Sequence, residues 1–274
     1  TMRAGVLVLG PLLAKHKKCI TSSPGGCLIG ARPINYHLKA LQATGVKFDI
    51  KKGYIYATAK NGLKGTNVKF PKISVGATEQ LLLASVLTAG RTILKNCAIE
   101  PEILDLCTML EKMGAKISGA GSHLLKIEGV EKLQGCTHRV IPDRIEAATY
   151  IMAGAITRGK VCVQGIRPSH LGAFAKVMKE SGIQLHEIGA DTIEVNTDQS
   201  GLKPFEVITL PYPGFPTDLQ AQACALACTI PGLSILTERV YPSRFMHIPE
   251  LLRMGAEVSL EGANAIVRGG KTLN

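Results

Sequence analysis

The feature that most constrains this chain is a segment that recurs four times along it. In each copy an apolar helical run ends at a glycine, and a run with alternating apolar and polar residues follows. The four glycines are Gly45, Gly114, Gly182 and Gly255, at spacings of 69, 68 and 73 residues. A glycine at this position predicts a left-handed C-cap that ends the helix. The alternation predicts a half-buried strand, which a tight turn joins to a second strand.

The residues between these segments follow a pattern of their own, in which an apolar helix leads into a short strand. The helices are expected to begin near Thr78, Ile145 and Thr217, and to end at Gly90, Gly159 and Gly232. We expect a further strand before each of these helices, such as residues 206–210. The full repeat is therefore strand, helix, strand, helix, strand, strand over about 70 residues.

The first copy of the repeat lacks its opening strand, because its helix starts at Thr1. At roughly 150 residues per domain, a chain of this length predicts two domains. Repeats of this kind bury their apolar faces against sibling copies. We therefore expect four copies, an α/β fold and a fragment from which further copies are missing.

The composition indicates a folded protein and favours anionic partners. Hydrophobic residues make up 46% of the chain and charged residues 19%, which indicates a folded protein rather than a disordered one. The net charge of +11 favours anionic partners, namely phosphorylated small molecules, nucleic acid or a membrane surface. The basic residues are scattered, and the densest run, residues 15–18, is short.

Neither a membrane span nor a secretion signal is predicted. No run reaches the roughly 18 apolar residues that a spanning helix needs. The apolar run after Arg3 is followed by residues 15–18, which make a poor cleavage site.

The eight cysteines predict no metal site, because none forms a C-x-x-C pair and no Cys/His cluster has zinc-ligand spacing. Scattered cysteines in a chain of this size indicate a reducing compartment. Four of them lie in apolar periodic runs and are expected in the core: Cys107, Cys162, Cys224 and Cys228.

A loop rich in glycine and proline, residues 22–33, contains Cys27 and Arg32. Glycines let the backbone move or approach a ligand closely, and such a loop can act as a lid. A cation such as Arg32 would favour the thiolate of Cys27. The alternative is a Gly-rich turn with a chance cysteine.

Two segments lead into expected helices. Lys72 and residues 73–75 precede one of them, where free backbone N–H groups suit a phosphate. The alternative is an ordinary helix cap with Thr78 as the N-cap. Asp218 lies in the first turn of another helix. It is either an acid that the helix dipole favours there or a general base that works through its position.

Two arginines complete the set of candidates. Arg244, in the segment 240–247, can clamp a phosphate or carboxylate with two parallel hydrogen bonds. Arg3 also lies near a helix start. Either arginine could instead be an ordinary solvated residue, and His247 is expected to be structural.

Together these motifs resemble the enolpyruvyl transferases, and among them the branch that acts on UDP-N-acetylglucosamine. Residues 24–27 followed by residues 29–33 look like the catalytic loop of that branch. Residues 74–78, 215–222 and 244–251 resemble its other signatures, in the same order. The resemblance covers the whole chain.

The resemblance implies a fold as well as an activity. The family fold is a two-domain inverse α/β barrel, with three repeats in each domain and the active site in the cleft between them. Residues 1–142 and 143–274 would then each contain two of the three repeats of one domain.

The implied reaction transfers enolpyruvyl from phosphoenolpyruvate to the 3-hydroxyl of UDP-N-acetylglucosamine and releases phosphate. It is the first committed step of cytoplasmic peptidoglycan synthesis. Asp218 would take the hydroxyl proton, and Cys27 would deliver a proton to the enolpyruvyl methylene and react with fosfomycin. Arg32 would neutralise phosphate charge. No metal or organic cofactor, nucleic acid or membrane is implied.

The resemblance also implies a set of substrate-binding residues. They are Arg3, Arg32, Pro33, Ile34, Asn35, Tyr36, Lys72, Ile73, Ser74, Val75, Asp218, Val240 and Arg244. One departure is Leu7, which stands where many relatives have an aromatic residue. Its presence removes a stacking surface near the uracil.

Three alternatives stay open. The sister enzyme of the shikimate pathway shares the fold and phosphoenolpyruvate but lacks the cysteine loop. Related repeats occur in RNA-processing enzymes, although low aromatic content and dispersed charge oppose RNA binding. The third is an inactive binding remnant. By the resemblance, a Lys-Asn pair, a phosphate-binding Arg and an acidic residue would lie outside the sequence, so residues 1–274 alone are expected to have no transferase activity.

Overall fold

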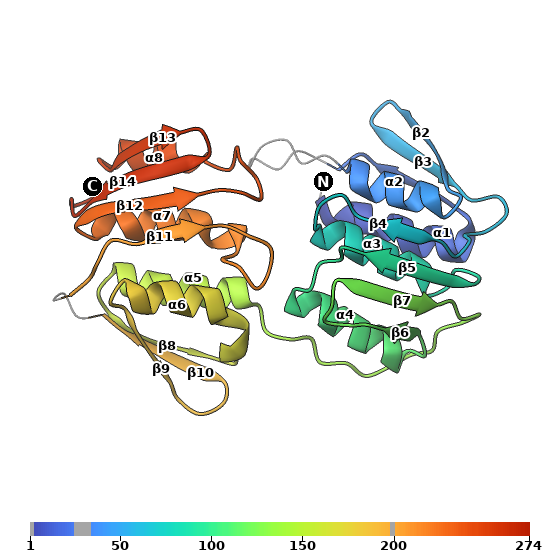
Figure 1. Ribbon diagram of the computed structural model, residues 1–274, viewed down its shortest axis with the longest axis horizontal. Coiled ribbons are helices and arrows are strands. Elements are labelled where there is room, and N and C mark those ends of the chain that lie inside the picture. Colours follow the sequence, from blue (N-terminus) through green and yellow to red (C-terminus); the bar gives the residue numbers. More distant parts are fainter. Residues whose placement is uncertain (1–2, 25–33, 198–200) are drawn as a thin grey trace. The chain divides into compact units, whose positions relative to one another are not determined.

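The computed structural model describes residues 3–24, 34–197 and 201–274. The chain divides into two compact units, residues 1–141 (unit 1) and residues 142–274 (unit 2). Each unit has its own apolar core. Strand residues alternate between buried and exposed, so each sheet packs on helices with one face and presents the other to solvent (Figure 1).

Unit 1 contains two copies of the repeat. The first consists of the 3-10 helix η1 (Arg3–Val8), α1 (Leu9–His16), β1 (Lys18–Ser22), α2 (Asn35–Ala43), β2 (Lys47–Lys51) and β3 (Tyr54–Thr58). The second consists of β4 (Asn67–Lys69), α3 (Val75–Ser85), β5 (Arg91–Lys95), α4 (Pro101–Lys112), β6 (Lys116–Ser118) and β7 (Leu124–Glu128). Their sheets have the orders β1-β3-β2 and β4-β5-β7-β6. The pair β4–β5 is parallel and the other pairs are antiparallel.

Unit 2 has the same plan. Its first copy consists of α5 (Arg144–Ile156), β8 (Lys160–Gln164), η2 (Pro168–Leu171), α6 (Gly172–Glu180), β9 (Gln184–Glu187) and β10 (Thr192–Asn196). Its second consists of β11 (Glu206–Ile208), η3 (Thr217–Leu219), α7 (Gln220–Thr229), β12 (Gly232–Thr237), α8 (Ile248–Arg253), β13 (Glu257–Glu261) and β14 (Asn264–Gly269). The sheets have the orders β8-β10-β9 and β11-β12-β14-β13, and only the pair β11–β12 is parallel among the described strands of this unit.

The predicted repeat is confirmed, and so are its glycine caps. Gly45, Gly114, Gly182 and Gly255 have φ angles of 99°, 100°, 84° and 89°. Each glycine ends a helix in the left-handed region, where a Cβ would be strained. A hairpin of two antiparallel strands follows in every copy, as the alternating pattern predicts.

One predicted strand is absent. No strand precedes α5 in residues 129–143, all of which the structure describes, so the third copy lacks its opening strand as the first does. The reason lies in the hydrogen bonds of this segment. The N–H of Val130 bonds to Val86 O, and that of Gln134 bonds to Met113 O. These backbone groups are thus occupied by helix ends of unit 1 and do not pair with β8.

The helices α3 and α7 occupy the interior of their units. Both helices have apolar or small residues on nearly all sides, which is typical of a buried helix rather than a surface one. Cys107, Cys224 and Cys228 are buried as predicted. Cys162 is exposed, so its predicted core position is wrong, because it lies on the outer face of β8, an edge strand. No helix in the described part of the chain is long and apolar enough to cross a membrane.

Candidate functional site

In unit 2 the structure brings together two residues that the sequence indicated separately. Asp218 lies on η3, the short turn that leads into α7, and Arg244 lies in the loop between β12 and α8. Arg244 Nη1 donates to Asp218 Oδ1 over 2.6 Å. The Arg244 side chain is 16% exposed and that of Asp218 is 55% exposed. The bond uses one carboxylate oxygen, and the exposure of Asp218 lets a solute hydroxyl approach this carboxylate.

A buried carboxylate lies behind this ion pair. Glu238 directly follows β12 and is 1% exposed. Its Oε1 accepts from Thr209 Oγ1 at 2.7 Å and from the N–H groups of Val240 and Tyr241 at 2.8 Å each. Its Oε2 accepts from Thr217 Oγ1 at 2.9 Å. Buried carboxylates need such donors, because desolvation of an unpaired charge is costly.

Thr217 connects the buried carboxylate of Glu238 to the Asp218–Arg244 pair. Thr217 Oγ1 also accepts from Arg244 Nη1 over 3.2 Å. The guanidinium of Arg244 lies over the ring of Tyr241, with Cζ 6.0 Å from the ring centroid. Arg244 is therefore held by a carboxylate, a hydroxyl and an aromatic face, and Val240 is tied to the same network through its backbone.

His247 follows in the same loop and is half-buried. Burial, and next the positive charge of Arg244, lower the pKa of His247 to about 4. The imidazole is therefore neutral near neutral pH and adds no second cation beside Arg244. This agrees with the expectation that His247 is structural.

In unit 1 the structure brings together the starts of α2 and α3. Ile34 is the N-cap of α2, and Asn35 and Tyr36 lie in its first turn. A Cβ added to Gly76, the second residue of α3, would lie 2.9 Å from His37 Cε1, so the two helix starts are in close contact. The predicted residues 34–36 and 72–75 thus lie near one another, and Lys72 is exposed beside them.

The N-cap of α3 is Ser74, and the assignment of Thr78 to that role is wrong. Ser74 Oγ accepts from the N–H of Ala77 over 3.3 Å. Thr78 lies one turn inside the helix, where its hydroxyl donates to Ser74 O and accepts from the N–H of Ala98. The first amides of a helix have no carbonyl partner within it, so those of α3 that Ser74 does not cap could meet an anion, with Lys72 nearby.

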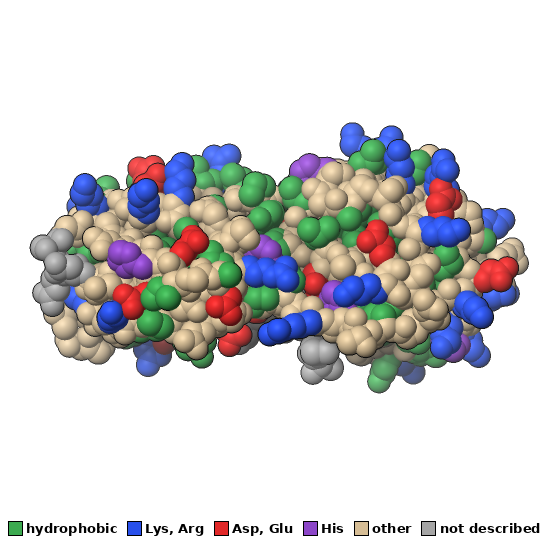
Figure 2. All heavy atoms as spheres, turned by 90° about the horizontal axis from the view of Figure 1, so that it is seen from below, with side chains coloured by type: hydrophobic (Ala, Val, Ile, Leu, Met, Phe, Trp, Pro, Cys, Tyr) green, Lys and Arg blue, Asp and Glu red, His purple; other side chains and the backbone are tan. Residues whose placement is uncertain are grey.

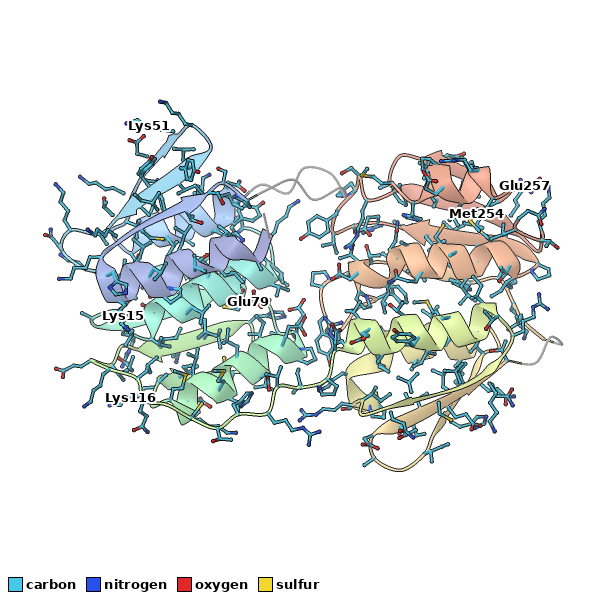
Figure 3. The ribbon with its side chains drawn as sticks, turned by 180° about the vertical axis from the view of Figure 1, so that it is seen from behind. Lys15, Lys51, Glu79, Lys116, Met254 and Glu257 are labelled. Atoms are coloured by element: carbon cyan, nitrogen blue, oxygen red, sulfur yellow. The ribbon has the colours of Figure 1, made fainter. Side chains whose placement is uncertain are left out.

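An acidic residue near this helix start was not predicted. Glu79 lies in the second turn of α3, and Figure 3 shows it at that end of the helix. Burial, followed by the charges of Glu102 and Glu100, raises the pKa of Glu79. Nothing in the local sequence marks this carboxylate, since its burial depends on the packing of α3 against its neighbours.

Several predicted residues cannot be placed in this geometry. Cys27, Arg32 and Pro33 lie outside the described residues. Arg3 opens η1, but its side chain is not described. Leu7 accepts a hydrogen bond from Gln80 Nε2 through its backbone oxygen over 3.3 Å. No group of three or more His, Cys, Asp or Glu side chains in the described ranges could hold a metal ion.

The residues that sequence reasoning missed in unit 2 are Glu238 and Thr217. Glu238 directly follows an apolar strand and stands six residues before Arg244, which is only a weak signal in the sequence. Thr217 stands next to Asp218, and its role depends on contacts with residues far along the chain.

The sequence matches a family model over residues 1–274, that of EPSP synthase (3-phosphoshikimate 1-carboxyvinyltransferase). It is 51% identical over 274 residues to the UDP-N-acetylglucosamine 1-carboxyvinyltransferase of Koribacter versatilis (strain Ellin345), covering all of this chain and 63% of that protein. It is 48% identical over 273 residues to the enzyme of that name from Paramagnetospirillum magneticum, again covering 63% of it. The chain thus spans less than two thirds of the length of these relatives.

Solved structures share the fold. The enolpyruvyl transferase NikO from Streptomyces tendae matches 96% of this chain and 63% of its own length, with a TM-score of 0.82 and 23% identity. EPSP synthase from Acinetobacter baumannii matches 98% of this chain and 64% of its own length, with a TM-score of 0.64 and 21% identity. These likenesses confirm the predicted inverse α/β barrel class.

Proposed function

Because the chain belongs to the EPSP synthase family of carboxyvinyltransferases, we propose that its protein transfers enolpyruvyl from phosphoenolpyruvate to the 3-hydroxyl of UDP-N-acetylglucosamine and releases phosphate. The hydroxyl oxygen attacks C2 of phosphoenolpyruvate while C3 gains a proton. The adduct then loses phosphate from C2 and a proton from C3, which restores the double bond. This activity would make the protein a cytoplasmic enzyme of peptidoglycan synthesis.

The observation that carries this proposal is the Asp218–Arg244 pair, which the buried carboxylate of Glu238 supports through Thr217. Asp218 accepts the 3-hydroxyl proton in our proposal. Its geometry supports this role, because one oxygen is held by Arg244 and the side chain is more than half exposed. A general base must first be within reach of its proton, and its pKa comes second. Arg244, with further N–H groups beyond Nη1, would contact an anionic part of the substrates.

Unit 1 is proposed to supply the remaining groups. Cys27 would protonate C3 of phosphoenolpyruvate, and Arg32 and Arg3 would offset the charge of its phosphate and carboxylate. Ile34–Tyr36, with Lys72 and residues 73–75, would bind the UDP-sugar. The contact between the starts of α2 and α3 supports this set as one surface, and the helix N-terminus favours phosphate oxygens. Val240 would add a contact from unit 2.

The UDP-sugar is favoured over 3-phosphoshikimate as the acceptor. Relatives named for the UDP-sugar are 51% and 48% identical over this chain, whereas the EPSP synthase of Acinetobacter baumannii is 21% identical. Cys27 adds support, because the shikimate branch lacks the cysteine loop. No observation favours RNA as a substrate.

Replacing Asp218 with Asn tests the assigned role of the base. The variant keeps an oxygen that can accept from Arg244 but can no longer take a proton at neutral pH. We expect kcat to fall roughly 10²–10⁴-fold, which is the usual contribution of a general base. The affinity for the UDP-sugar, measured by calorimetry, should change little. Wild-type turnover in the variant would return Asp218 to the role of a helix-start acid.

Labelling with fosfomycin tests the role assigned to Cys27, with Cys162 as an internal control. Cys162 is exposed, but partial desolvation and its hydrogen bond to Glu194 raise its pKa, which disfavours the nucleophilic thiolate. We expect peptide mapping of the labelled protein to find the adduct on Cys27 alone. An adduct on Cys162, or none, contradicts the assignment.

A further inference from the structure

We infer that Glu238 is a positioning residue that sets the geometry of Asp218 and Arg244 for the transfer reaction, and this inference rests on the function proposed above. Glu238 does not touch Asp218 or Arg244 through any hydrogen bond of the described structure. It acts instead through Thr217 and through the backbone of residues 240 and 241. Thr217 therefore stands between the carboxylate of Glu238 and the Asp218–Arg244 pair that would contact the substrate.

The first argument is that Glu238 joins three separate segments of unit 2. Thr209 follows β11, Thr217 begins η3, and Val240 and Tyr241 belong to the loop that contains Arg244. All three segments donate to the one carboxylate. Removing these bonds would leave η3 and the Arg244 loop joined through the side chain of Arg244 but without their shared buried anchor. Since Asp218 is on η3, both members of the pair would lose their common support.

The second argument is the direction of the hydrogen bonds. An ionised carboxylate only accepts, so Thr217 must donate its single proton to Glu238 Oε2. The lone pairs of the Thr217 hydroxyl are then left to accept from Arg244 Nη1. The chain of donors runs from Arg244 through Thr217 to Glu238. The same Nη1 bonds to Asp218, so the orientation of Thr217 bears on the pair directly.

The third argument is burial. Glu238 is 1% exposed and accepts four hydrogen bonds, whereas Asp218 is exposed and Arg244 is mostly covered. A satisfied buried network specifies one arrangement of its members. Asp218, which is more than half exposed, would be held less firmly by its bond to Arg244 alone, because an ion pair open to solvent contributes little.

Glu238→Gln is the variant that separates positioning from folding. Gln has nearly the same shape, and its amide oxygen can keep the three bonds that Oε1 accepts. Its NH₂ group then faces Thr217 and donates, so the Thr217 hydroxyl can no longer donate in that direction. We expect kcat to fall roughly 10²-fold, the scale of a misplaced catalytic group. The KM for each substrate should change far less.

Two variants of Thr217 and one distant control complete the series. Thr217→Val removes the hydroxyl at similar volume and should lower kcat as Glu238→Gln does. Thr217→Ser keeps the hydroxyl and should restore most of the activity. Glu257→Gln removes a carboxylate of the same unit that is paired with Lys271 in an exposed position, labelled in Figure 3, and should leave kcat unchanged.

The measurement combines turnover with a readout that does not depend on turnover. Nitrogen-15 NMR of the Arg244 guanidinium, assigned with Arg244→Lys, should show a hydrogen-bonded Nη–H signal in the wild type and in Thr217→Ser. The signal should shift or broaden in Glu238→Gln and Thr217→Val while the melting temperature stays near that of the wild type.

Two results would overturn the inference. One is an unchanged Arg244 signal in Glu238→Gln and Thr217→Val. The other is a loss of activity that follows the melting temperature alone and that Thr217→Ser does not restore. If the wild type releases no phosphate at all, the proposed function fails, and the Arg244 signal still decides whether Glu238 holds the pair.

Discussion

At the scale of single residues, His247 links the stability of unit 2 to acidity. It lies beside Arg244 and near the ring of Phe245, with ring centroids 6.3 Å apart. Its pKa in the folded protein is about 4, against an ordinary value of 6.5, because burial and then Arg244 disfavour the charged imidazole. Between these two values the unfolded chain binds a proton that the folded protein does not bind. The contribution of His247 to stability is therefore full above pH 6.5, and stability decreases as the pH falls toward 4.

His247→Gln tests this account, because Gln is polar but does not titrate in that range. We expect the melting temperature of the wild type to fall between pH 6.5 and pH 4, and the fall to be smaller in the variant. His186→Gln, which removes an exposed histidine on β9, is the control and should keep the wild-type slope. Equal slopes in wild type and His247→Gln would contradict the account.

Single residues of the site could be predicted from the sequence, but their pairing could not. Asp218 and Arg244 are marked by residue type and by their positions at a helix start and in a loop. They lie 26 residues apart, and only the fold brings them into contact. Glu238 was missed because an acid after a strand usually lies in solvent. Of its four donors, the N–H groups of Val240 and Tyr241 are local, whereas the hydroxyls of Thr209 and Thr217 come from distant segments that the local sequence does not reveal.

At the scale of elements, α1 packs so closely on α3 at Gly10 that a side chain has no room there. A Cβ at this position would lie 2.6 Å from both Gln80 Nε2 and Gln80 O, and 3.3 Å from Ala84 N. Two of these three atoms belong to the backbone of α3, so the helices would have to move apart. Gln80 itself holds η1 through its bond to Leu7 O, so this crossing also places the helix that Arg3 opens.

Gly10→Ala should therefore destabilise unit 1 by about 1–3 kcal/mol, the usual range for overpacking a core. Gly5→Ala is the matched control, because nothing lies within 4 Å of a Cβ there. Its effect should stay within about 0.5 kcal/mol. Urea unfolding of both variants measures the difference. Equal midpoints for the two would show that the α1–α3 contact is looser than described.

The order of the elements could largely be predicted, because glycine caps and alternation are local signals. Gly45 and its three counterparts end helices through their own backbone angles. The opening strand of the third copy could not be predicted correctly, since a strand requires a partner in a sheet. In residues 129–143 the backbone groups of Val130 and Gln134 find partners in unit 1 instead.

At the scale of the whole molecule, the basic residues are scattered along the chain, but the net positive charge is unequally distributed. The first 78 residues contain 13 Lys and Arg and one acidic residue, Asp49, whereas the other 196 residues contain 19 basic and 20 acidic residues. Asp49 is itself paired with Lys51 at 2.5 Å. Figure 2 shows basic side chains gathered at the right-hand end of unit 1, and Figure 3 places Lys15 and Lys51 at its outer edges. The long-range field of the protein therefore comes mostly from the first half of unit 1.

This field should attract the two anionic substrates. We expect kcat/KM to fall as salt rises, because the screening length shrinks from about 30 Å at 0.01 M to about 8 Å at 0.15 M. The double variant Lys18→Glu/Lys47→Glu reverses two exposed charges that flank Thr58 on one sheet face. It should lower kcat/KM at low salt and have little effect at high salt.

The control for this prediction is Lys179→Glu/Lys203→Glu, which makes the same change in net charge on exposed positions of unit 2. Its effect at low salt should be smaller, since unit 2 lacks the excess of positive charge. A similar loss from both double variants would mean that total charge matters and its distribution does not.

The choice of acceptor tests the central claim most directly. The protein, with any coding sequence that flanks residues 1–274, should be expressed and supplied with phosphoenolpyruvate and one acceptor at a time. We predict phosphate release with UDP-N-acetylglucosamine and none with 3-phosphoshikimate. Release with 3-phosphoshikimate, or with neither acceptor, would contradict the account.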